Sequence, residues 1–93
     1  MAVDPRDNVA VLLRDVAAGD EVRIRIGAAD ERLVAAEAVP LGHKIARRQI
    51  ENGAQIVKYG EVIASATTGI SAGQHVHVHN VASNRAKVRQ TNP

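Results

Sequence analysis

Apolar and polar residues alternate over several short stretches of the chain. In residues 20–26, Val22, Ile24 and Ile26 alternate with charged residues, which is the period-two pattern of a half-buried strand. Extended segments are also predicted at residues 31–38, 45–50, 54–59, 61–66 and 74–81. The first of these also fits a helical turn, and we favour the strand. Short strands at this close spacing predict a compact barrel-like or sandwich-like β domain.

A different pattern precedes these strands and predicts one N-terminal helix. Asp4 suits the capping position, and Pro5 suits the first helical position. Apolar residues then recur at helical spacing, at Val9, Leu12, Leu13 and Val16. Gly19 ends the predicted helix. The expected fold class is therefore mostly β, a small domain of short strands with one N-terminal helix.

One local pattern occurs three times along the chain. It consists of a β-branched residue, two small or polar residues, Gly, two more small or polar residues and a second β-branched residue. The three copies are residues 16–22, 50–56 and 70–76, with Gly19, Gly53 and Gly73 at their centres. This pattern predicts a tight turn with a backbone angle that Gly permits, followed by a strand whose first inward residue is apolar.

The composition limits the size of the core and the class of protein. At 93 residues the chain forms one domain at most, and it contains no Phe, no Trp and a single Tyr, Tyr59. A partner that covers apolar surface would help so thin a core. The sequence has no Cys, no secretory signal pattern and no apolar window approaching the ~20 residues of a membrane span. We therefore expect a cytoplasmic protein with no membrane association.

The formal net charge of +2 is unevenly distributed. Arg85, Lys87 and Arg89 follow the last predicted strand, and no acidic residue occurs after Glu61. Such a tail suits a solvated extension or a contact with an acidic surface, and it has no stacking aromatic residue. We expect an extension and no nucleic-acid partner. The predicted organisation is an extension at residues 1–6, one domain at residues 7–82 and a basic tail at residues 83–93.

Three of the four histidines lie at alternate positions, at His75, His77 and His79. On a strand these imidazoles would point to one face and the two intervening valines to the other. Same-face Cα atoms are then about 6.5–7 Å apart, so that two imidazoles can converge on one divalent metal ion. The alternative is that the valines face the core and the histidines lie on a solvated face. Asn80 adds an amide that either holds a substrate group or ends the strand.

A second candidate is the loop that contains Pro40 and Gly42. This loop can place the imidazole of His43 beside the cation of Lys44, which would suit an anionic substrate. The alternative is that both are ordinary surface residues. The sequence shows no carboxylate pair at a useful spacing, no Ser-His-Asp arrangement and no phosphate-binding Gly-rich loop. The chain by itself therefore does not hold a complete catalytic apparatus.

Four motifs occur in order along the chain. They are Asp-Asn-Val-Ala at residues 7–10, Pro-Leu-Gly-His-Lys-Ile-Ala at 40–46, Ile-Val-Lys-Tyr-Gly-Glu-Val-Ile at 56–63 and His-Val-His-Val-His-Asn at 75–80. Together they resemble the N-terminal SAF-type domain of the altronate and galactarate dehydratase family, over nearly the whole chain. The resemblance implies a SAF-like β-clip fold and a cytoplasmic lyase that acts on sugar acids or related 2-hydroxy acids. It also implies a requirement for Fe²⁺ or another divalent metal in the complete enzyme.

In those dehydratases the domain is fused to a much larger catalytic region. The resemblance therefore implies the small subunit of a two-component hydroxy-acid lyase, completed by a large catalytic subunit of the same family and acting on a small anionic 2-hydroxy acid. A sulfolactate sulfo-lyase, which converts sulfolactate to pyruvate and sulfite, is the first expectation. The alternatives are an altronate- or galactarate-type dehydratase and a non-enzymatic SAF module that binds a ligand or partner. A homo-oligomer is compatible with each of them.

The resemblance carries site roles to five residues of this chain, which are His43, Lys44, His77, His79 and Asn80. It implies catalytic roles for the three histidines, with His77 or His79 acting as a base or lying near the metal. His77 and His79 are the implied metal ligands, shared with the large subunit. Lys44 or Asn80 is the implied partner of the substrate carboxylate. His75 carries less weight, because relatives have other residues at its position.

Overall fold

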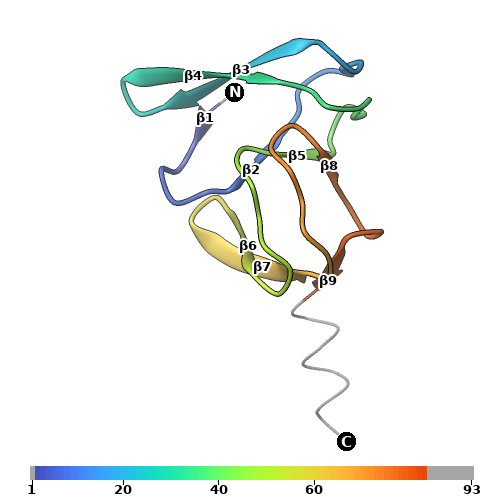
Figure 1. Ribbon diagram of the computed structural model, residues 1–93. Coiled ribbons are helices and arrows are strands. Elements are labelled where there is room, and N and C mark those ends of the chain that lie inside the picture. The colour runs from blue at the N-terminus through green and yellow to red at the C-terminus, as the bar shows by residue number, and fades with distance from the viewer. Residues whose placement is uncertain (1, 84–93) are drawn as a thin grey trace, which may run out of the picture.

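Strands, turns and loops make up residues 2–83, the part of the chain that the computed structural model describes, and they include no helix. Three sheets of three strands lie one above another (Figure 1). The upper sheet contains β1 (Ala2–Val3), β3 (Glu21–Ile26) and β4 (Ala29–Val34). The central sheet contains β2 (Val9–Val11), β5 (Lys44–Ala46) and β8 (His75–Val76). The lower sheet contains β6 (Gln55–Lys58), β7 (Glu61–Ala66) and β9 (Val81–Ser83), and the mostly β class is confirmed.

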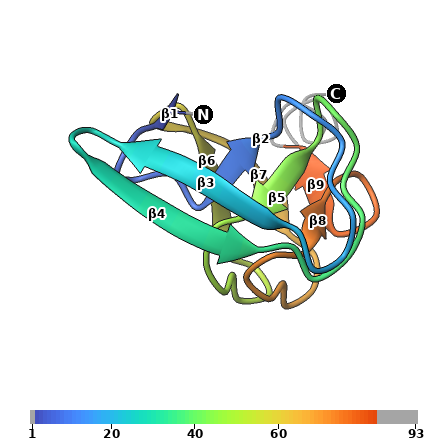
Figure 2. The same ribbon diagram turned by 90° about the horizontal axis from the view of Figure 1, so that it is seen from above.

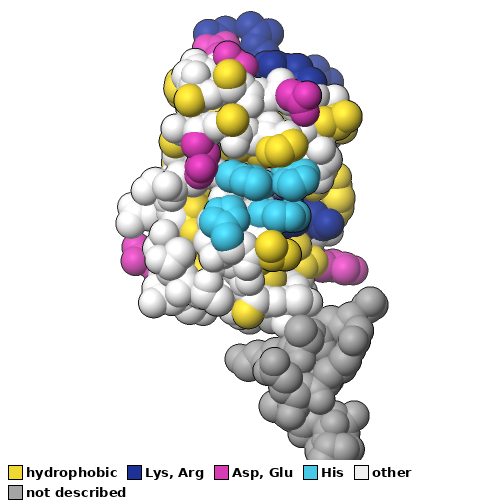
Figure 3. All heavy atoms as spheres, turned by 90° about the vertical axis from the view of Figure 1, so that its right-hand side faces the viewer, with side chains coloured by type: hydrophobic (Ala, Val, Ile, Leu, Met, Phe, Trp, Pro, Cys, Tyr) yellow, Lys and Arg dark blue, Asp and Glu magenta, His cyan; other side chains and the backbone are white. Residues whose placement is uncertain are grey.

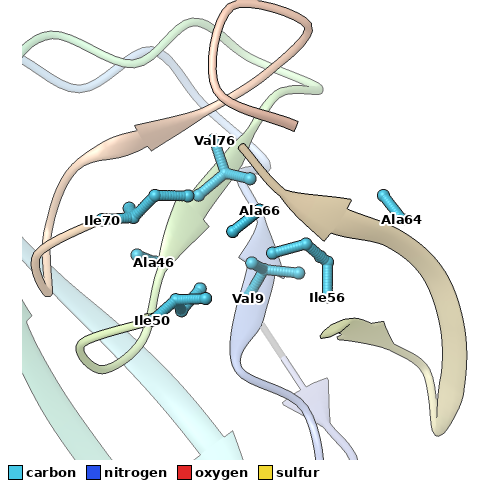
Figure 4. Close-up of a cluster of buried hydrophobic side chains, with 8 residues drawn as sticks. All are labelled: Val9, Ala46, Ile50, Ile56, Ala64, Ala66, Ile70 and Val76. Atoms are coloured by element: carbon cyan, nitrogen blue, oxygen red, sulfur yellow. The ribbon is translucent and has the colours of Figure 1, made fainter. Parts of the chain in front are cut away.

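The central sheet lies between two hydrophobic clusters and is buried on both faces. Successive side chains of a strand point to opposite faces. Val9 accordingly packs with Ala46 and Val76 against the lower sheet (Figure 4), whereas Ala10 and Ile45 pack against the upper sheet. The buried members of both clusters are Val, Ile, Leu and Ala residues. Aliphatic packing on two sides of one sheet thus replaces the aromatic core that this composition lacks.

The predicted N-terminal helix is wrong, because its residues fold as a turn and a strand. Asp4 lies in the turn, where its carbonyl oxygen accepts the N–H of Asp7 at 2.9 Å. Val9–Val11 forms β2, and Leu12 is buried directly after it. Leu13, which the helix would have buried, is 71% exposed. Of the four apolar residues at helical spacing, only Val9 lies in β2, whereas Leu12 and Val16 are buried in the segment that follows it. Their spacing therefore does not mark one face of a helix.

The strand predicted at residues 20–26 is confirmed as β3. It pairs antiparallel with β4, from Glu21 opposite Val34 to Ile26 opposite Ala29, and this hairpin extends past the central sheet (Figure 2). β4 also confirms the strand interpretation of the next segment. β1 pairs with β3 in parallel, so the expected N-terminal extension contributes a short strand to the upper sheet. The predicted basic tail, apart from Ser83 in β9, lies outside the described residues.

The three copies of the repeated pattern form the same four-residue turn, as predicted. In each, the residue after Gly donates its N–H to the carbonyl oxygen two residues before Gly, at 3.0 or 3.1 Å. Gly73 has a φ of 88°, and a Cβ at this position would collide with the carbonyl oxygen of Val34. Residues 40–43 form a fourth such turn, in which Gly42 has a φ of 82°. This turn leads His43 directly into β5.

The strand predicted at residues 74–81 is interrupted. β8 ends at Val76, residues 77–80 form a turn, and β9 then starts a pairing with the lower sheet. Val76 is fully buried, whereas Val78 is 80% exposed at the turn. The expected arrangement, with imidazoles on one strand face and valines on the other, is therefore wrong beyond Val76.

No described segment forms a helix with the length and apolar character needed to span a bilayer.

Candidate functional site

The register of the central sheet brings the two histidine-containing motifs together. β5 and β8 are antiparallel and pair Lys44 with Val76. One step further along this register, His43 lies opposite His77 at the point where the pairing ends. The two rings stack with their centroids 4.2 Å apart. The end of β5 and the end of β8 therefore build the site jointly.

All four histidines of the chain gather in one patch, the histidine cluster of His43, His75, His77 and His79 (Figure 3). Nδ1 of His43 lies 2.8 Å from Nε2 of His75, which is a hydrogen-bond distance. The His75 ring centroid is 5.4 Å from that of His77 and 5.2 Å from that of His79. His75 is therefore in contact with each of the other three rings.

Asn80 holds the turn that carries His77 and His79. The residue is 6% exposed. Its Oδ1 accepts the His77 N–H at 3.0 Å, and its Nδ2 donates to the His75 carbonyl oxygen at 2.8 Å. An Asn side chain that bonds nearby backbone groups in this way competes with strand pairing, which explains why β8 is short. The structure thus gives Asn80 a role in fixing the backbone, and its predicted role in substrate binding stays a prediction.

A carboxylate that the sequence analysis did not identify lies beside the cluster. Glu37, in the loop between β4 and β5, accepts the His75 N–H at Oε2 over 3.0 Å. Its negative charge also acts on the His75 imidazole in the direction that raises the pKa, against larger effects that lower it. Glu37 and His75 are 38 residues apart, and an exposed Glu in a loop carries no sequence signal of such a contact.

Burial and mutual repulsion favour the neutral form of two imidazoles in the cluster. Burial lowers the pKa of His75, and the charges of His43, His79 and His77 lower it further. Desolvation and the charges of His43, Lys44 and His79 likewise lower the pKa of His77. A neutral imidazole has a free nitrogen lone pair, which can accept a proton or bind a metal ion.

A pocket of about 310 Å³ adjoins the cluster, and this volume suits a small molecule. Lys44 and His77 supply charged and polar groups to its wall, and Ile63, Val78 and Val81 are among its apolar lining. Burial lowers the pKa of the half-buried Lys44, and the charge of Lys58 lowers it further. Lys44 is thus the cationic group of this pocket lining.

Three members of the cluster are placed to hold a metal ion. One ring nitrogen each from His43, His75 and His77 lies within 4.8 Å of the other two. Imidazole nitrogens suit divalent transition metals such as Fe²⁺ and Zn²⁺, so this donor set fits the metal that the resemblance implies. His79, a predicted ligand, lies beside His75 and is not part of this set.

All five predicted site residues come together in the structure, with Asn80 in the turn beneath the histidine cluster. His43, His77 and His79 belong to the cluster, and Lys44 lies in the adjoining pocket. His75, which carries less weight in the sequence analysis, lies at the centre of the cluster. The catalytic and binding roles assigned to these residues remain predictions.

The fold and the site together define a small β domain that presents clustered imidazoles and a lysine beside a small pocket. Comparison with known proteins then identifies the family. Residues 1–84 match the family described as the altronate/galactarate dehydratase SAF domain. The chain belongs to this family, and the resemblance seen in its motifs is confirmed.

Relatives of two kinds are similar to this chain. Altronate dehydratase of Escherichia coli (strain K12) is 40% identical over 84 residues, which is 90% of this chain and 16% of that protein. The (2R)-sulfolactate sulfo-lyase subunit alpha of Chromohalobacter salexigens is 41% identical over 49 residues, which is 53% of this chain and 52% of that subunit. The same subunit from Paracoccus pantotrophus is 38% identical over 56 residues, 60% of this chain and 84% of that subunit. The chain thus spans a small part of the altronate dehydratase and about half of the first sulfo-lyase subunit.

Proposed function

We propose that this chain is the small subunit of a cytoplasmic, two-component hydroxy-acid lyase whose large subunit completes the active site over the histidine cluster. The observation that carries the proposal is the position of the cluster beside a pocket that contains Lys44. Membership of the dehydratase family and relatives named as subunit alpha of a sulfo-lyase support it. The proposed substrate is sulfolactate, with altronate or galactarate as the alternative.

The shared reaction removes a proton next to a carboxylate and expels a leaving group from the β carbon. Lys44 is proposed to bind the substrate carboxylate, because it is the cation that lines the pocket. His79, exposed at the edge of the cluster, is the proposed proton acceptor. As the C–H bond breaks, its electron pair forms a C=C bond and sulfite or hydroxide departs. The resulting enol becomes the keto acid product by taking up a proton at carbon.

Fe²⁺ or another divalent metal is the proposed cofactor of the complete enzyme, and it would polarise the hydroxy-acid and stabilise the charge that develops on deprotonation. Within this chain, His43, His75 and His77 are the residues placed to hold such an ion. The ring of His77 also lines the pocket, so this set faces the proposed substrate.

The exposed face of the cluster supports the need for a second subunit. His79 is exposed, and so are Val78 at 80% and Leu41 at 58%, which neighbour the cluster in sequence. A reaction that develops charge proceeds better where water is excluded. A large subunit seated on this face would cover the apolar side chains and close the pocket.

Co-expression with a large subunit of the same family tests the proposal. The pair is expected to purify as one complex and to release sulfite and pyruvate from sulfolactate, or to dehydrate altronate or galactarate. Failure to form a complex would contradict the small-subunit assignment. A stable complex without turnover of any of these acids would favour a non-enzymatic binding module instead.

Lys44→Met tests the role of the pocket cation in that complex. Loss of one ionic contact to substrate is expected to raise KM by about 10- to 100-fold, since each ~1.4 kcal/mol corresponds to a factor of ten. Lys58→Met is the matched control, because Lys58 lies close enough to influence Lys44 yet does not line the pocket. An equal rise in KM for both variants would show that substrate binding depends on the overall positive charge and not on a direct contact with Lys44.

His79→Gln tests the proposed proton acceptor. The substitution is expected to lower kcat by about 10²–10⁴-fold with little change in KM, because a general base acts mainly in the transition state. An unchanged kcat would exclude His79 as the base and transfer this role to the large subunit.

A further inference from the structure

We propose that His43, His75 and His77 form a complete site for one divalent transition-metal ion within this chain, without ligands from a large subunit. Only the role of the bound ion in catalysis rests on the proposed lyase function. Binding of the ion is a property of the free chain and is measured separately.

The ring nitrogens of the three histidines are close enough together to bind one metal ion. The three candidate ligand atoms lie within 4.8 Å of one another, and Nδ1 of His43 is 2.8 Å from Nε2 of His75. Nitrogens bound to one metal at ~2.0–2.1 Å lie about 3.0–3.4 Å apart, depending on coordination geometry. Small rotations of the rings about their side-chain bonds would bring the nitrogens from their present separations to those of a metal-bound site.

The backbone under the three rings is already fixed. The His43 N–H donates to the Pro40 carbonyl oxygen at 3.0 Å within the Gly42 turn. The His75 N–H donates to Glu37 and the His77 N–H donates to Asn80, each at 3.0 Å. Since the three positions are held before any ligand binds, little conformational entropy opposes metal binding.

The chemistry of the donors selects the class of ion. Ca²⁺ and Mg²⁺ prefer oxygen ligands, and all three donors here are imidazole nitrogens. Fe²⁺, Co²⁺, Ni²⁺ and Zn²⁺ accept such a set and keep open positions for water or substrate. Glu37 places one negative charge near His75, while Lys44 lies on the pocket side near His77. A metal ion and Lys44 would together make the pocket strongly attractive to an anion.

The alternative is that these rings form only a chain of hydrogen bonds between imidazoles. The 2.8 Å contact between His43 and His75 fits that arrangement as well. The two cases differ in their response to metal ions: a metal site binds one ion with a defined ligand field, whereas a hydrogen-bonded chain does not.

Titration of the isolated chain with Co²⁺ tests the proposal, with visible absorption and calorimetry as the readouts. One Co²⁺ per chain and ligand-field absorption bands from nitrogen coordination are expected. His43→Gln, His75→Gln and His77→Gln should each weaken binding by at least about tenfold, since even the loss of an outer-shell contact costs ~10–100-fold. Gln49→Ala, at an exposed position outside the histidine cluster, is the control and should change the affinity by less than about twofold.

Paramagnetic broadening of the wild-type imidazole resonances by Co²⁺ covers the case in which a variant does not fold. The signals of His43, His75 and His77 should broaden or shift at lower metal concentration than surface signals far from the cluster. Absence of a ligand-field spectrum, or equal loss of affinity in all four variants, would overturn the metal site. The Co²⁺ titration uses the isolated chain and does not depend on turnover by the two-subunit complex. Failure of the metal site and failure of the lyase assignment are therefore distinguishable.

Discussion

Substitution of Asn80 separates a structural role from a role in substrate binding. Its buried amide makes one hydrogen bond to the His77 N–H and one to the His75 carbonyl oxygen. Each bond contributes about 1 kcal/mol net, and leaving a buried partner unpaired adds to the cost. We therefore expect Asn80→Ala to lower the free energy of unfolding by about 2–3 kcal/mol, out of the ~5–15 kcal/mol typical of a domain.

Urea unfolding of the free chain, followed by far-UV circular dichroism, measures this change. In a separate thermal melt, the melting temperature should fall by about 10–20 °C, using ~4–8 °C per kcal/mol for a domain of this size. Asn80→Asp keeps the acceptor for His77 and removes the donor to His75, so an intermediate loss is expected. Asn52→Ala, at an exposed turn, is the control and should change stability by less than about 0.5 kcal/mol. Unchanged stability of Asn80→Ala, together with a raised KM in the complex, would refute the structural role.

Three further predictions concern the fold and its response to pH. Asp7 is fully buried and accepts the backbone N–H groups of Asp4, Tyr59 and Gly60, so Asp7→Ala should lower the free energy of unfolding by about 3–5 kcal/mol in urea melts. Gly73→Ala should cost at least about 2 kcal/mol by the same measurement, because its Cβ meets backbone at positive φ, whereas Gly53→Ala has open space around the Cβ and should cost less. For His75 and His77 the pKa is lowered in the folded state from 6.5, so below this pH the unfolded chain binds protons that the folded chain does not. Stability of the metal-free chain should therefore fall as the pH drops through 6.5 toward the folded-state pKa, and the fall should be shallower in the His75→Gln, His77→Gln double variant.

Local sequence was sufficient for features that depend on neighbouring residues. The alternation in residues 20–26 correctly predicted β3, and the repeated Gly pattern correctly predicted three identical turns. The helix prediction failed because Val9 packs into one hydrophobic cluster while Leu12 and Val16 pack into the other, so their burial is set by distant strands and not by one helical face. The prediction of a continuous histidine strand failed because the side chain of Asn80 ends β8.

The sequence by itself determined the residue types available for the site: four histidines, a lysine next to one of them and no aromatic core. Its ordered motifs also determined the family to which the chain belongs. Only the tertiary structure decided that His43 stacks on His77, that His75 lies between the other imidazoles and that Glu37 lies beside it. The physical reason is that these contacts depend on the register between β5 and β8 and on the loop before β5. The pairing of these two strands, which are distant in sequence, follows in turn from the burial of the whole central sheet.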